Sequence, residues 1–187
     1  MKAGVLSLQG DFREHARMFV EAGATPVEVR TLEDLAGVQC LAIPGGESTT
    51  IALLARSSDL VDPIRERAAE GMPILGTCAG MIVLDRNHLG LVDLEVARNA
   101  WGRQVHSFEA DLDVKGEERP LRGVFIRAPW IAEAGPDVEI LAEHDGHPVL
   151  ARQGRVLVAA FHPELTEDTR VHEKFMQLVE EGSNVRA

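Results

Sequence analysis

The chain has 187 residues, and its 45% hydrophobic content fits a globular protein with a sizeable core. Its 30 acidic and 19 basic residues give a formal net charge of −11, and no basic stripe typical of nucleic-acid-binding proteins is present, so we exclude nucleic acid as a partner. The sequence lacks both a signal-peptide pattern and an apolar run of membrane-spanning length. We therefore expect no membrane partner and a cytoplasmic protein, in which Cys40 and Cys78 stay reduced.

The first half of the chain alternates short apolar runs with helical patterns. Phe12, Ala16, Phe19 and Val20 recur at helical spacing, and Gly23 ends that helix. The predicted strands are 3–8, 27–29, 40–43 and 72–75, and the predicted helical segments are 12–22, 32–35, 48–55, 59–69 and 81–84. We expect Asp11, Ser48 and Asp59 to act as N-caps. This order predicts a parallel sheet covered by helices on both faces.

Strand patterns dominate the second half of the chain. They cover residues 91–96, 104–114, 123–126, 138–143, 148–152 and 156–161. Asp145-Gly146 and Gln153-Gly154 are typical of hairpin turns, so antiparallel strands are added to the parallel core. A final helix over 168–181 turns Val171, Phe175, Leu178 and Val179 inward. With no linker or internal repeat, we expect residues 1–187 to form a single domain.

The pentapeptide Gly76-Thr77-Cys78-Ala79-Gly80 stands between a predicted strand and a predicted helix. Glycines around a central nucleophile permit the tight turn that holds its side chain at the carboxyl end of the strand. The N-terminus of the next helix favours negative charge, which suits both a thiolate and an oxyanion. A buried structural cysteine in a glycine-rich turn is the alternative interpretation.

The buried-strand pattern of residues 156–161 ends at His162-Pro163-Glu164. A thiol nucleophile needs a base, imidazole has a suitable pKa, and a carboxylate two residues later can orient the ring. His162 could reach Cys78 if its strand is central and parallel to the strand before Cys78. The sequence therefore favours a Cys–His–Glu triad over a polar turn that merely exposes His162.

Three loops follow parallel strands and should converge on one site, because ligands bind at the carboxyl ends of such strands. These loops begin at Gln9, at Pro44 and at the Cys78 turn. We interpret His15 and His172 as residues of helix-surface packing, and Cys40 as a small buried hydrophobe. The remaining histidines lack paired ligand spacing, so we expect neither a metal nor another cofactor.

Longer sequence motifs indicate which protein family the chain resembles. Together with the Cys78 and His162-Pro-Glu164 motifs, they resemble the glutaminase subunit of pyridoxal 5′-phosphate synthase, the PdxT/SNO family of class I triad glutamine amidotransferases, nearly end to end. The strings are Leu8-Gln-Gly10, Arg13-Glu-His15, Pro44-Gly-Gly-Glu-Ser-Thr-Thr50, Arg98-Asn99, Gly102-Arg-Gln104, Ser107-Phe-Glu-Ala110, Val124-Phe-Ile-Arg-Ala-Pro129 and Phe161-His-Pro-Glu-Leu-Thr-Glu167.

The resemblance implies a three-layer, flavodoxin-like α/β fold and hydrolysis of glutamine to glutamate and ammonia. It implies that Cys78 is the nucleophile, His162 the base and Glu164 the residue that orients His162. Ammonia would pass to a synthase subunit of the PdxS family, a dodecameric core in that family, which builds pyridoxal 5′-phosphate from ribose 5-phosphate and glyceraldehyde 3-phosphate. Further implied roles are glutamine binding by Gly46, Glu47, Ser48, Arg98, Ile126 and Arg127, an oxyanion hole from the N–H groups of Gly46 and Ala79, and coupling to the partner through Gln9.

The segment between Leu84 and Leu91 is shorter than is usual in the family, and Trp101 and Trp130 stand where other residues are common. Three alternatives remain open. The chain could be a stand-alone cysteine hydrolase or chaperone-like protein of related fold, a non-catalytic binding subunit, or a glutaminase that serves another synthase.

Overall fold

The computed structural model describes residues 1–98, 101 and 107–184, with side chains described up to 181. Its central element is a seven-stranded sheet of order β2-β1-β3-β4-β11-β10-β9. The first five of these strands are parallel, and β10 and β9 extend the sheet in the antiparallel sense. Their bounds are β1 Lys2–Leu6, β2 Thr25–Val29, β3 Cys40–Ile43, β4 Ile74–Thr77, β9 Glu139–His144, β10 His147–Gln153 and β11 Val156–Ala159.

Burial along the strands explains their order in the sheet. Every residue of β3, β4 and β11 is buried, as expected for central parallel strands with both faces covered, whereas in β2 at the edge only Val29 is buried. In β11, Val156 to Ala159 pair in register with Ile74 to Thr77 of β4. This pairing brings the residues that follow both strands to the same edge of the sheet.

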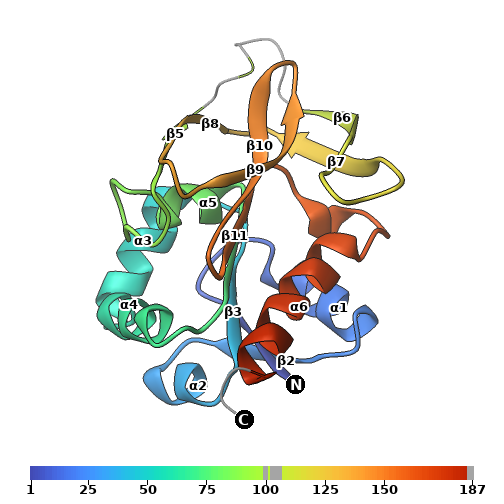
Figure 1. Ribbon diagram of the computed structural model, residues 1–187. Helices are drawn as coiled ribbons and strands as arrows, with labels where there is room; N and C mark the ends of the chain where they lie inside the picture. Colours follow the sequence, from blue (N-terminus) through green and yellow to red (C-terminus); the bar gives the residue numbers. More distant parts are fainter. Residues whose placement is uncertain (99–100, 102–106, 185–187) are drawn as a thin grey trace.

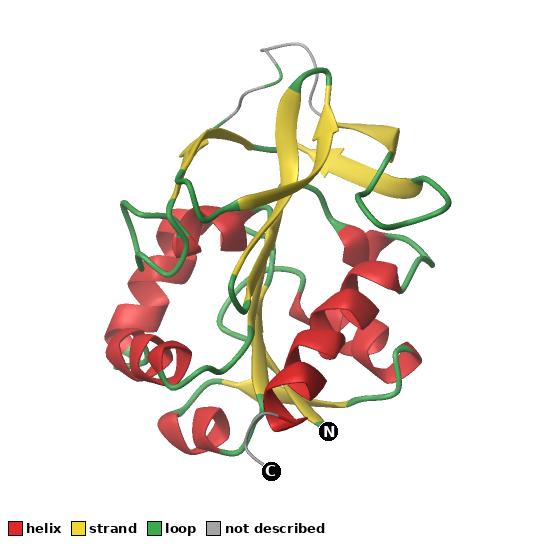
Figure 2. Ribbon diagram, in the orientation of Figure 1, coloured by secondary structure: helices red, strands yellow, loops and turns green. Residues whose placement is uncertain are grey.

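Helices cover both faces of the sheet, which is seen edge-on between them (Figures 1 and 2). One face carries α1 and α6, and the other carries α3, α4 and α5; the short α2 lies beside β2. The bounds are α1 Phe12–Glu21, α2 Leu32–Ala36, α3 Ser48–Ser57, α4 Val61–Ala69, α5 Ala79–Leu84 and α6 Arg170–Asn184, with a 3-10 turn, η1, at Pro163–Leu165.

Two small antiparallel sheets lie above the carboxyl end of the parallel strands (Figure 1). One pairs β5 Leu94–Ala97 with β8 Trp130–Ala134, and the other pairs β6 Ser107–Leu112 with β7 Leu121–Ile126. The α/β class, the mostly parallel sheet and the added antiparallel strands confirm the predicted fold class. Among the described residues, no helix combines the length and apolar character required to cross a bilayer.

Several local predictions were wrong. The sequence patterns did not predict β8 or η1, and the predicted strand 91–96 begins three residues before β5. Glu47, not Ser48, caps α3, because its carboxylate reaches the N–H groups of Thr49 and Thr50. Asp59 has a φ of +55° and precedes the first turn of α4, which it does not cap. Residues 104–106 of the predicted strand 104–114 lie outside the described residues.

The buried face of α1 coincides only in part with the apolar residues that recur at helical spacing. Val20 is 59% exposed, whereas His15, Met18 and Phe19 are buried. Asp11 occupies the N-cap position of α1, but its side chain makes no capping bond. On α6 the prediction was correct, since Val171, Phe175, Leu178 and Val179 are all buried, and His172 is buried as well.

Candidate active site

Cys78 lies in the sharp turn between β4 and α5. Its φ of +48° and ψ of −105° are unusual for a residue with a side chain, and its N–H donates to the Ala159 carbonyl at 2.8 Å. A Cβ on Gly80 would overlap the Ile43 carbonyl, and one on Gly76 would lie 2.9 Å from the Gly80 carbonyl carbon. The turn therefore needs both glycines, and it holds Cys78 at the N-terminus of α5.

His162 follows β11, the strand beside β4, as the sequence analysis required for contact with Cys78. Its Nδ1 atom lies 2.7 Å from Oε1 of Glu164, and its backbone N–H donates to the Val124 carbonyl at 2.8 Å. His162 is 4% exposed and Glu164 is fully buried in η1. The bond to Glu164 leaves Nε2 as the ring nitrogen available to Cys78, which is the geometry of a base with an orienting carboxylate.

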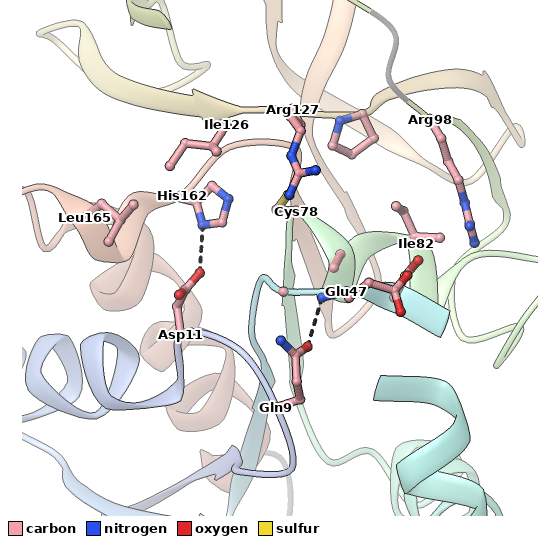
Figure 3. Close-up of a pocket in the computed structure, with 14 residues that line it drawn as sticks. Gln9, Asp11, Glu47, Cys78, Ile82, Arg98, Ile126, Arg127, His162 and Leu165 are labelled. Carbon is pink, nitrogen blue, oxygen red and sulfur yellow. Dashed lines mark hydrogen bonds and ion pairs between the residues drawn. The ribbon is translucent and has the colours of Figure 1, made fainter. Parts of the chain in front are cut away.

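Asp11 brings a second carboxylate to the same imidazole. Its Oδ2 lies 3.4 Å from Nδ1 of His162, as the dashed line in Figure 3 marks. Burial alone would lower the pKa of His162, but hydrogen bonds with Asp11, Cys78 and Glu164 outweigh it and raise that pKa to about 12. These contacts favour the protonated form of the His162 ring.

Ligand atoms of Asp11, His162 and Glu164 lie within 4.8 Å of one another, close enough to share a cation. The 2.7 Å bond between His162 Nδ1 and Glu164 already engages the nitrogen that such an ion would need. The donor set therefore fits acid–base chemistry better than metal binding.

The glycine-containing loop after β3 lies beside Cys78. Gly46 has a φ of +153°, and a Cβ there would collide with the Gln9 side chain, whose Oε1 accepts from the Glu47 N–H at 2.8 Å. A Cβ on Gly45 would collide with the His162 ring. As the first residue of α5, Ala79 has an N–H with no acceptor in its own helix. The loop thus brings backbone donors close to the nucleophile.

A cavity of about 500 Å³ opens over these groups. Figure 3 shows Arg127 directed toward Cys78 from above and Gln9 below. The cavity brings together every residue that the sequence analysis assigned to the site, except the fully buried Glu164. Its lining residues are Gln9, Asp11, Gly46, Glu47, Ser48, Cys78, Ala79, Ile82, Arg98, Ile126, Arg127, Pro129, His162 and Leu165.

Charges of both signs stand on the cavity wall. Arg127 has a φ of +44°, and Arg98 lies 3.3 Å from Nε2 of His88 through its guanidinium. The Glu47 carboxylate accepts from the side chain of Thr50 and from the N–H groups of Thr49 and Thr50, and these bonds lower its pKa to about 2. A ligand that carries both a cation and an anion is the natural match to this wall.

The interpretation of His15 and His172 as surface packing was wrong, because both are fully buried. His15 lies 3.3 Å from Glu164 through Nε2 and 2.8 Å from His172 through Nδ1. Asp11 was also missed as a site residue. Its position in the loop after β1, one of the three loops expected to converge, was the available signal. His15 stands in the Arg13-Glu-His15 motif, to which no role was assigned, and nothing in the sequence marked His172; the burial of both depends on packing between α1 and α6.

The whole chain has close relatives. The model of the SNO glutamine amidotransferase family matches residues 5–181. A Pelotomaculum thermopropionicum protein described as pyridoxal 5′-phosphate synthase subunit PdxT is 53% identical over 196 aligned positions that cover all of both chains. A Mycobacteroides abscessus protein with the same description is 50% identical, over 96% of this chain and 97% of the relative.

Solved structures with a similar fold include a glutamine amidotransferase, in line with the descriptions of these relatives. A crystal structure described as a glutamine amidotransferase superposes with a TM-score of 0.91 at 49% identity, covering 95% of this chain and 98% of that one. The structure of PurLQS from Thermotoga maritima, at 18% identity and a TM-score of 0.72, shares the fold over 96% of this chain and 97% of that one. With a family match from residue 5 to residue 181 and relatives near 50% identity along the whole length, the chain belongs to the SNO glutamine amidotransferase family.

Proposed function

We propose that residues 1–187 act as a single glutaminase domain that hydrolyses L-glutamine to L-glutamate and ammonia with a Cys78–His162–Glu164 triad. One observation carries this proposal: the strained Cys78 turn and the His162–Glu164 pair follow adjacent parallel strands and meet in one cavity. Membership of an amidotransferase family supports the same chemistry.

The reaction follows from the groups present. The Cys78 sulfur attacks the side-chain amide carbon of glutamine, and N–H groups of Gly46 and Ala79 bind the oxyanion that forms. His162 gives a proton to the departing ammonia, which leaves a thioester on Cys78. His162 then takes a proton from water, the water oxygen attacks the thioester carbon, and glutamate leaves as the thiol is restored. Glu164 keeps the ring of His162 in the required orientation.

Glutamine recognition fits the charges on the cavity wall. Glutamine carries an α-ammonium and an α-carboxylate, and the wall offers the Glu47 carboxylate and the guanidinium groups of Arg98 and Arg127. We infer that these residues, with Gly46, Ser48 and Ile126, bind the substrate. No cofactor enters the proposed reaction.

We infer that the ammonia serves pyridoxal 5′-phosphate synthesis, as the descriptions of the relatives indicate. The partner would be a synthase subunit of the PdxS family, arranged as a dodecameric core, and Gln9 would couple it to the site through the Glu47 N–H. Free ammonia takes up a proton in bulk water, so a sealed passage to the partner has a chemical reason. The need for a reduced Cys78 supports a cytoplasmic location.

The test is glutamate release from glutamine by the wild type and by Cys78→Ala, each with and without the synthase subunit. Release that requires Cys78 and rises with the synthase is the expected result. Release that requires Cys78 but ignores the synthase would refute the coupling and point to another partner enzyme. Equal release by Cys78→Ala would refute the role of Cys78 as the nucleophile, and no release from the wild type under either condition would refute the glutaminase and favour a binding subunit.

A further inference from the structure

Two buried histidines extend the chain of hydrogen bonds behind Glu164. His15 of α1 and His172 of α6 are both 0% exposed. Nδ1 of His15 lies 2.8 Å from Nε2 of His172, while Nε2 of His15 lies 2.9 Å from Oγ1 of Thr77 and 3.3 Å from Oε2 of Glu164. The proposed reaction uses neither ring, although burying two imidazoles without purpose is costly.

The direction of these hydrogen bonds follows from the charge on Glu164. If His15 Nε2 carried a lone pair, that lone pair would face a carboxylate oxygen 3.3 Å away, which is repulsive. A proton on Nε2 instead has two acceptors nearby, Thr77 Oγ1 at 2.9 Å and Glu164 Oε2 at 3.3 Å, and its charge attracts the carboxylate. Among the described residues no hydrogen bond to Oε2 meets ordinary geometric limits, so the 3.3 Å contact with His15 Nε2 is what offsets the burial of this oxygen.

His172 selects this tautomer of His15. When Nε2 of His15 holds the proton, its Nδ1 must accept, and Nε2–H of His172 is the donor 2.8 Å away. Nδ1 of His172 then carries a lone pair and no proton. The reverse assignment would leave a buried N–H on that atom, which has no partner among the described residues. Phe19 packs edge-on against the His172 ring, with centroids 5.1 Å apart, and fixes its plane.

We propose that His15 is a positioning residue of the glutaminase site: its Nε2–H holds Oε2 of Glu164, and His172 fixes the tautomer of His15 that can do so. The proposal rests on the proposed triad of Cys78, His162 and Glu164. It adds a second layer of hydrogen bonds, carried by α1 and α6, to a site whose reacting groups follow β4 and β11.

The consequence concerns the charge of Glu164. Burial raises the pKa of this carboxyl, and a hydrogen bond donated to the charged form opposes that rise. Removing the His15 N–H should therefore let Glu164 take up a proton at higher pH, and the bond that orients His162 weakens. The charged or titratable groups that face this cluster are His162 and Asp11 near the cavity, His172 on α6 and Arg17, whose guanidinium donates to the Glu164 carbonyl.

Glutamine and asparagine distinguish the two ring nitrogens. The amide nitrogen of Gln overlays Nε2 of histidine, whereas that of Asn overlays Nδ1. We expect His15→Gln to keep kcat within about threefold of the wild type. His15→Asn and His15→Ala should lose about 10- to 100-fold in kcat, the range for outer hydrogen-bond partners of metal ligands, with KM nearly unchanged. Their acid limb of kcat/KM should move to higher pH. Equal profiles for His15→Gln and His15→Asn would overturn the proposal.

The variant Phe19→Leu serves as the control for packing, because it disturbs the contact with His172 and leaves every polar group in place. This variant should lose stability without any shift of the pH profile. His147→Gln, at a ring stacked on Trp130 outside the cavity wall, controls for the loss of a histidine as such. If Phe19→Leu shifts the acid limb as far as His15→Asn does, the role of His15 is only structural and the proposal fails.

A second readout does not depend on turnover. Nitrogen-15 NMR of labelled histidine in the full chain should show His15 and His172 as neutral Nε2–H tautomers at pH 7, assigned by their loss in the His15→Gln and His172→Gln variants. An imidazolium or an Nδ1–H tautomer at His15 would overturn the proposal.

Alkylation of Cys78 by iodoacetamide separates this proposal from the proposed triad. If the rate in the wild type depends on pH and on His162, and His15→Asn shifts that dependence while His15→Gln does not, both proposals hold. If His162→Ala leaves the rate unchanged, the triad fails. If the rate depends on His162 but all His15 variants follow the wild type, only the role of His15 fails.

Discussion

Two carboxylates reach for the same nitrogen of His162. The carboxylate of the fully buried Glu164 lies 2.7 Å from Nδ1. The carboxylate of Asp11 lies 3.4 Å from the same atom, and the Asp11 side chain is 39% exposed on the cavity wall. Together they favour a protonated ring. The geometry assigns them different tasks, because the shorter bond orients the imidazole and the longer contact adjusts its charge.

Asp11→Asn should therefore lower the pKa of His162 while the bond to Glu164 stays in place. The His162 ring then stays protonated over a narrower pH range. In the pH profile of Cys78 alkylation, the alkaline limb should therefore move to lower pH by about one unit. Asp62→Asn, on the exposed side of α4, is the control and should leave the profile unchanged. Identical profiles for Asp11→Asn and the wild type would show that Asp11 does not influence His162.

Gly45 provides the space that the His162 ring occupies. A methyl group at Gly45 would collide with Cε1 of that ring, and the φ of Gly45 lies outside the left-handed region, so Gly45→Ala tests steric clearance alone. A ring displaced by about 1 Å should lower kcat by about 100-fold. Gly37→Ala is the matched control, since its Cβ would have 3.4 Å to the nearest atom. Glutaminase kinetics of both variants decide the point, and equal kcat values would contradict it.

At the scale of the element, the residue that caps α3 also lines the cavity. Glu47 caps the helix through bonds from the N–H groups of Thr49 and Thr50, and it also lines the site. Its folded pKa of about 2 lies below the unfolded value near 4.5, so its stabilising effect is present above pH 4.5 and is lost as the pH falls toward 2.

Glu47→Ala should therefore lower the midpoint of thermal unfolding at pH 7 and raise KM for glutamine, since both the cap and an anionic wall residue are lost. Glu47→Gln keeps an acceptor for the helix and should recover most of the midpoint but little of the KM. Thermal unfolding and steady-state kinetics separate the two effects. A parallel recovery of both quantities would indicate that Glu47 acts on the site only through the helix.

Sequence patterns located the elements whose burial is continuous and missed those that depend on distant partners. The apolar runs of β3, β4 and β11 could be predicted because central parallel strands need hydrophobic residues on both faces. β8 follows Pro129 without a turn signal and carries only one fully buried residue, Ile131, so its pairing with β5 left no pattern to detect. The residues expected at the site could be found from motifs, whereas His15 and His172 are buried only because α1 and α6 pack together.

For the whole molecule, buried neutral histidines make stability depend on pH. Burial lowers the pKa of His172 to about 3, and burial with nearby His172 and His162 lowers that of His15 well below 6.5. The unfolded chain therefore binds more protons than the folded chain below pH 6.5, and the free energy of unfolding falls as the pH drops. Each extra proton gives a limiting slope of about 1.4 kcal/mol per pH unit. His162 acts on the other side, because its raised pKa makes stability fall as the pH rises from 6.5 toward 12.

His172→Gln should flatten the acid side of this curve. Urea unfolding between pH 4 and pH 7 would measure the slope, with His147→Gln, at a partly exposed ring, as the control. A slope for His172→Gln as steep as that of the wild type would show that His172 is not the source of the acid sensitivity.

The pairing of β4 with β11 also bears on when the protein becomes active during its own synthesis. Cys78 is made early, whereas His162 and α6, the helix that carries His172, lie more than 80 residues later in the chain. A ribosome therefore carries a nascent chain with a cysteine that has neither its imidazole nor a closed sheet around it. Because the last central strand inserts between β4 and β10, the reactive centre and the completed core arise in the same late step. We therefore expect chains that end before β11 to release no ammonia.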